Sequence, residues 1–187
     1  EFAWTYDDAE YTVSVSIGYL HYLDLHGRSQ DIRGTVGEGS IVFADPSDPV
    51  IAALASKLES MASGIGLDPV ETADFILAFV QSMGSDGTKL WKYPVEVLFE
   101  TSGNDRSCSA LYASLMSSLG YRSSLLLFPG HTAAGVEIEG SKGVFYSYYG
   151  IKYRYCECSP SSDESVGEKP EGIANRVSMI LEVRFQE

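Results

Sequence analysis

Hydrophobic positions recur at helical spacing in three stretches of the chain, at about residues 49–63, 69–83 and 105–119. The first two open with Asp-Pro, which supplies a side-chain cap and a Pro at the first helical position. A Gly follows each stretch and marks its end. We expect the three apolar stripes to face a common core, because a domain of this size needs those faces. The stripes are Ile51, Leu54, Leu58 and Met61; Val70, Ala73, Ile76, Leu77 and Val80; and Cys108, Leu111, Leu115 and Leu119.

Strand-like alternation precedes and follows these helices. Between Trp4 and Ile17 it is clearest from Tyr11 onward, where Val13 and Val15 share a face, and it predicts a half-buried strand. Further strands are predicted at about residues 121–128, 132–138, 143–149, 151–158 and 176–185. Glycines in the short connections are typical of hairpins, so the sheet is expected to be an antiparallel meander. The predicted class is α+β, with helices packed on an antiparallel β-sheet.

The segment before the first Asp-Pro helix holds the first strand and two shorter apolar pieces. We therefore expect residues 1–45 to form an N-terminal β segment that packs on a core domain of residues 46–187. His21 and His26 lie in this segment. No metal-ligand spacing accompanies them, so we interpret both as surface or strand-end residues.

Composition narrows the classes of partner. The chain has 187 residues, of which 44% are hydrophobic, and this suits one globular unit with a sizeable core. Its net charge of −13 repels phosphate groups, which argues against nucleic acid or an anionic membrane surface as a partner. A cationic or neutral partner is easier to accommodate.

No apolar run reaches the roughly 18 to 20 residues that a membrane span needs, so we expect no membrane insertion by this fragment. The chain lacks an initiating Met, and we expect it to be part of a longer protein. The localisation stays open, with an extracellular or membrane-anchored full-length protein among the alternatives.

Three cysteines leave the redox compartment open, because an odd count leaves one thiol unpaired. Cys156 and Cys158 lie too close along one strand to bridge each other comfortably. A disulfide from Cys108 to either of them is one alternative, and three free, buried thiols are the alternative that we favour.

The residues with the clearest chemical potential lie around the third helix and after it. A Gly-Asn turn leads into this helix, and a Pro-Gly turn after the next strand delivers His131 to the strand that follows. The positive partial charge of a helix N-terminus favours a thiolate or a carboxylate, and Asp105 and Cys108 both lie near it. His131 could serve as base or proton partner, and Glu157 could orient its ring.

The order and spacing of these pieces resemble those of the transglutaminase-like superfamily, which has the papain-like cysteine-enzyme fold, and in particular its archaeal domains. The resemblance covers most of the chain. It rests on W-T-Y-D-D-A-E-Y-T-V-S-V-S-I, D-P-V-I-A-A-L-A-S-K-L, E-T-A-D-F-I-L-A-F-V-Q-S, Y-P-V-E-V-L, P-G-H-T-A-A-G-V and Y-R-Y-C-E-C. It implies a transglutaminase-like core, no cofactor, and a peptide or protein segment bound in the cleft. The polar loop 85–92 would border that cleft, where Trp91 and Tyr93 either line a groove or cap the core edge.

The resemblance also implies a degenerate catalytic triad. In the family, the nucleophilic Cys precedes by fifteen residues the Gly that ends its helix, and counting back from Gly120 lands on Asp105. Cys108 falls three residues late. His131 and Glu157 match the family's His and acidic residue, so the departure is at the nucleophile itself.

Three interpretations stay open. The one that we favour is a pseudoenzyme that binds a peptide or protein segment, because the mixed anhydride formed by an Asp105 carboxylate would be a high-energy species. The second is a cysteine-dependent acyl-transfer enzyme, a peptidase or transglutaminase, that uses Cys108. A three-residue shift would move its sulfur by roughly 4 to 5 Å along the helix axis, and Cys108 also shares the apolar stripe of a core thiol. The third is a divalent-cation site formed by Asp105, His131 and Glu157.

Overall fold

The computed structural model describes residues 1–184, and it confirms the mixed α+β architecture. The helices are α1 (Tyr19–Ile32), η1 (a 3-10 helix, Gly37–Phe43), α2 (Pro49–Gly64), α3 (Pro69–Gln81), α4 (Pro94–Glu100) and α5 (Asp105–Ser118). The strands are β1 (Phe2–Tyr6), β2 (Ala9–Val13), β3 (Gly84–Ser85), β4 (Ser102–Gly103), β5 (Ser123–Phe128), β6 (His131–Val136), β7 (Phe145–Tyr148), β8 (Ile151–Cys156) and β9 (Met179–Glu182). Residue 185 of the predicted closing strand lies outside the described residues.

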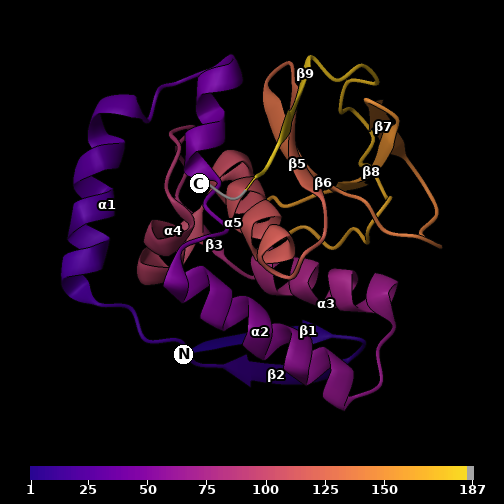
Figure 1. The fold of residues 1–187 in the computed structure, drawn as a ribbon, viewed down its shortest axis with the longest axis horizontal. Coiled ribbons are helices and arrows are strands. Elements are labelled where there is room, and N and C mark those ends of the chain that lie inside the picture. Colours follow the sequence, from indigo (N-terminus) through magenta and orange to yellow (C-terminus); the bar gives the residue numbers. More distant parts are fainter. Residues whose placement is uncertain (185–187) are drawn as a thin grey trace.

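Helix α5 is the centre of the fold (Figure 1). It packs against β5 and β6 on one side and against α2, α3 and α4 on the other. Every residue from Ser107 to Ser117 is buried, including the predicted core residues Cys108, Leu111 and Leu115. A helix that is covered on all sides fixes the relative positions of its neighbours. The start of α5 is therefore held firmly against the sheet.

The main sheet has five strands in the order β7-β8-β6-β5-β9, and every pairing is antiparallel. The antiparallel prediction is confirmed, but the simple meander is wrong, because β8 lies between β6 and β7. The β6–β8 pairing puts Ala134 opposite Cys156. Since side chains alternate along a strand, this register brings His131 and Glu157 to the same end and the same face of the sheet.

The expected N-terminal β segment is only partly β structure. Where one strand was predicted, the chain forms the β1–β2 hairpin, which packs on α3 (Figure 1). Asp7 and Asp8 make its turn with positive φ, a conformation that short acidic side chains tolerate. Residues 19–32 then form helix α1. The strand-end interpretation of His21 and His26 is wrong, because both lie on this helix. Their side chains are 35% and 34% exposed, and both bond to carboxylates.

The predicted helix starts are confirmed. Asp48 accepts a hydrogen bond from the backbone N–H of Val50, and Asp68 forms a capping box with Glu71. The apolar piece at residues 95–99 is helical and belongs to α4, which also opens with Pro at its first position. Within the described part of the chain, no helix combines the length and the apolar character needed to cross a membrane.

Candidate functional site

Asp105 begins helix α5 and is tied to strand β6. The cap of this helix is Asn104, whose side-chain oxygen accepts hydrogen bonds from the backbone N–H groups of Arg106 and Ser107. Asp105 is therefore free to face the sheet, and its Oδ2 accepts a hydrogen bond of 2.8 Å from the N–H of Thr132. This bond places a carboxylate beside the first residue of β6.

His131 lies between two carboxylates. Its Nδ1 is 3.3 Å from Oδ2 of Asp105, and its Nε2 is 3.0 Å from Oε2 of Glu157. Only 14% of the His131 side chain is exposed, so the three groups interact largely away from solvent. The structure thus brings together three of the four candidate residues, Asp105, His131 and Glu157, as a row of side chains with the imidazole between the two carboxylates.

Two residues that the sequence did not single out fix Glu157. Ser159 donates to Oε1 from its backbone N–H at 3.0 Å and from its hydroxyl at 2.6 Å. The Tyr155 hydroxyl donates to Oε2 at 2.5 Å and lies 3.2 Å from Nε2 of His131. Burial and the neighbouring Glu157 raise the pKa of Tyr155 well above its ordinary value, so the hydroxyl stays a donor.

These contacts stabilise the charged forms of His131 and Glu157. Burial alone would lower the pKa of His131, because it disfavours the charged imidazole. The hydrogen bonds and charges of the Asp105 and Glu157 carboxylates outweigh this effect and raise the pKa from 6.5 to about 9. Burial would also raise the pKa of Glu157, but hydrogen bonds and charge from His131, with the bonds from Ser159 and Tyr155, lower it below its ordinary value. At neutral pH, His131 is an imidazolium that faces two carboxylates.

Cys108 does not join this row. Its side chain is fully buried in the core, and burial, reinforced by the charges of Asp86 and Asp105, raises the pKa of its thiol to about 12. A thiol in this environment is neither accessible nor ionised at neutral pH. Cys156 and Cys158 are buried free thiols as well, so the favoured expectation of three free thiols agrees with the structure.

The row is poorly arranged for a single metal ion. The two carboxylates lie on opposite nitrogens of the same ring, and one cation cannot bind both sides of an imidazole. The geometry therefore does not favour the divalent-cation interpretation of Asp105, His131 and Glu157.

A pocket of about 280 Å³ opens beside His131. It lies between the segment that follows α1, the start of α5, the β5–β6 turn and the start of β9. Trp91 lines this pocket and is also almost fully buried in the core. Tyr93 does not line the pocket and packs instead against Phe43.

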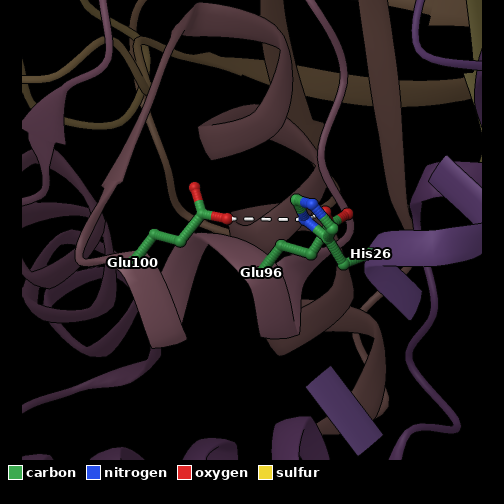
Figure 2. A group of neighbouring side chains, drawn as sticks. All are labelled: His26, Glu96 and Glu100. Atoms are coloured by element: carbon green, nitrogen blue, oxygen red, sulfur yellow. Dashed lines mark hydrogen bonds and ion pairs between the residues drawn. The ribbon is translucent and has the colours of Figure 1, made fainter. Parts of the chain in front are cut away.

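A second cluster of polar side chains joins α1 to α4 (Figure 2). His26, Glu96 and Glu100 offer ligand atoms that all lie within 4.8 Å of one another, the arrangement expected of a cation site. However, Arg33 lies 3.0 Å from the fully buried Glu96 carboxylate, and Lys92 lies 2.9 Å from that of Glu100. Because both carboxylates already have cationic partners, we interpret this cluster as an ion network that holds the two helices together.

No protein-family model matches the chain, and no curated protein or solved structure matches it either.

The first prediction concerns the titration of His131. In wild type, NMR should show its imidazole titrating near pH 9, and Asp105→Asn should lower that pKa by removing one of the two charges. Since the folded pKa exceeds the unfolded value, the stabilisation is fully present below about pH 6.5 and is lost as pH rises through about 9. The unfolding free energy should therefore fall between pH 7 and 9 less steeply in His131→Gln than in wild type. A wild-type pKa of His131 at or below 6.5 would contradict its pairing, as an imidazolium, with Asp105 and Glu157.

The second prediction concerns the ion network of α1 and α4. Arg33→Met should lower the free energy of unfolding by about 3 kcal/mol, because it removes the guanidinium that pairs with the buried Glu96 carboxylate. Adding Glu96→Gln should recover part of the loss, since the amide carries no charge. Urea unfolding of wild type, Arg33→Met, Glu96→Gln and the double variant measures this difference. Losses that add up in the double variant would show that the two groups are independent.

Proposed function

We propose that this chain is a transglutaminase-like domain that has lost its thiol nucleophile and binds a peptide or protein segment in the cleft beside His131. The observation that carries the proposal is the Asp105 carboxylate at the position of the missing nucleophile. In a catalytic triad, the nucleophile contacts one nitrogen of the imidazole and the acidic residue contacts the other. In this chain, Asp105 faces Nδ1 and Glu157 faces Nε2.

Substituting Asp for the nucleophile turns a reactive arrangement into a stable one. A general base must be neutral to accept a proton, whereas His131 is held as an imidazolium by two carboxylates. Asp105 is a weak nucleophile toward amides, and its ion pair with His131 occupies the ring nitrogen that a thiol would need. On this proposal the domain keeps the cleft and has no acyl-transfer activity.

The burial of Cys108 supports the same proposal. To act as the nucleophile, its sulfur would have to leave the core and displace Asp105 from His131. The pKa of this thiol, about 12, also leaves almost no thiolate at neutral pH. A thiol enzyme based on Cys108 is therefore not the function that the geometry favours.

The third prediction tests the geometry by restoring a thiol at the family position. Asp105→Cys should create a thiol that iodoacetamide labels rapidly at pH 6, because a helix N-terminus and an adjacent His lower a thiol pKa to between about 3.5 and 7.5. The matched control is Asp105→Cys with His131→Ala, which keeps the new thiol and removes its partner, and its labelling should be much slower. Asp105→Ser provides a folded background in which only the native cysteines can react. Labelled sites are identified by mass spectrometry.

Two results would overturn the proposed function. One is an equal labelling rate in Asp105→Cys with and without His131, which would mean that the ring does not act on that position. The other is hydrolysis or transamidation of a peptide amide by wild type that Cys108→Ala abolishes. In the second case, the nucleophile would have moved along the helix and the domain would be an enzyme.

A further inference from the structure

The pocket beside His131 differs in charge from the rest of this acidic chain. The chain has 26 acidic residues against 13 basic ones. Within residues 1–184, no Asp or Glu lines this pocket, whereas Arg106 and His131 do. His131 already faces two carboxylates, and these three groups together carry one net negative charge. Arg106 is therefore the cation of the pocket lining that remains for a ligand.

Arg106 has no anionic partner in the described part of the chain. Its Nη1 donates to the backbone carbonyl of Lys89 at 2.6 Å, and no carboxylate oxygen lies within ion-pair distance of it. By contrast, Arg33 and Lys92 are paired with buried or partly buried carboxylates. An unpaired guanidinium at the edge of a pocket suits an anionic ligand group, above all a carboxylate, which it can bind through two hydrogen bonds.

The walls of the pocket are apolar and held in place. Trp91 donates from its indole N–H to the carbonyl of Thr35 at 3.0 Å and stacks on Phe43 at 5.5 Å. Phe128 and Met179 form further apolar parts of the lining. Because these side chains are already packed, little ordering is required when a ligand enters. The volume of about 280 Å³ lies just below the range of roughly 300 to 1,000 Å³ that holds drug-sized ligands, so it suits a single amino-acid residue.

We propose that this pocket binds the C-terminal residue of a partner peptide, with an apolar side chain between Trp91 and Met179 and its free carboxylate on Arg106. This inference rests on the proposed function and specifies which segment occupies the cleft. A C-terminal residue carries an apolar side chain and a carboxylate together, which matches a one-residue pocket with apolar walls and one cation. An internal acidic residue supplies the charge but little apolar area, and its chain would have to continue out of the pocket on both sides.

The fourth prediction compares three fluorescein-labelled peptides of one composition by fluorescence anisotropy. One ends in Phe with a free carboxylate, one ends in Phe carboxamide, and one carries Phe internally with both ends blocked. The free acid should bind at least about ten-fold more tightly than the amide, because its carboxylate can form charge-assisted hydrogen bonds with Arg106 that a neutral amide cannot form. Arg106→Gln should reduce the affinity for the acid to that for the amide and leave the amide unchanged.

Arg28→Gln is the matched control, since it removes one positive charge from the exposed face of α1 and should leave the binding of all three peptides unchanged. Equal affinity for acid and amide in wild type would overturn this inference, and that comparison does not depend on how any variant folds. Binding of the blocked peptide alone would also overturn it but leave the proposed function standing. Binding of none of the three peptides would count against both proposals.

Discussion

The imidazolium of His131 between two carboxylates is the interaction on which the rest of the site depends. Its partners come from distant parts of the chain, because Asp105 starts the central helix and Glu157 follows strand β8. Burying these charges is costly unless each one is paired, and here the pairing extends to Thr132, Ser159 and Tyr155. The row can exist only where α5, β6 and β8 meet in one register, so it also reports on the correct packing of helix on sheet.

The packing of α5 against the sheet also places the two candidate nucleophiles, Asp105 and Cys108, in different environments. The N-terminal turn of α5 is open at Asp105 and closed at Cys108, because the helix is covered on all sides from Ser107 onward. A carboxylate gains stability from the helix N-terminus and from His131. A thiol one turn further along gains nothing from either and packs as a small apolar side chain. Under the proposed function, the domain has exchanged reactivity for stability at one position and kept the neighbouring pocket for recognition.

The sequence predicted best the features that depend on local signals. The Asp-Pro helix starts, the buried stripe of α5 and most strands of the main sheet follow from caps and periodicity. Helix α1 was missed because only Leu25 and Ser29 of its residues are buried, so it shows no apolar stripe. The hairpin turn at Asp7 and Asp8 lacks Gly or Pro, and the position of β8 depends on long-range pairing. The contacts of Tyr155 and Ser159 with Glu157 depend on how strand β8 pairs with β6, which the sequence does not reveal. Whether Arg106 has a carboxylate partner likewise depends on the tertiary fold.

Native-state labelling of the wild-type cysteines tests the central claim most directly. The folded protein is exposed to iodoacetamide at pH 6 and pH 8, quenched at intervals, unfolded, and analysed by mass spectrometry for modification at each Cys. The account predicts that Cys108 reacts only as slowly as the protein unfolds, at a rate similar to those of the buried Cys156 and Cys158. Rapid and selective modification of Cys108 in the folded protein at pH 6 would contradict it, because that thiol would then be exposed and ionised as a nucleophile must be.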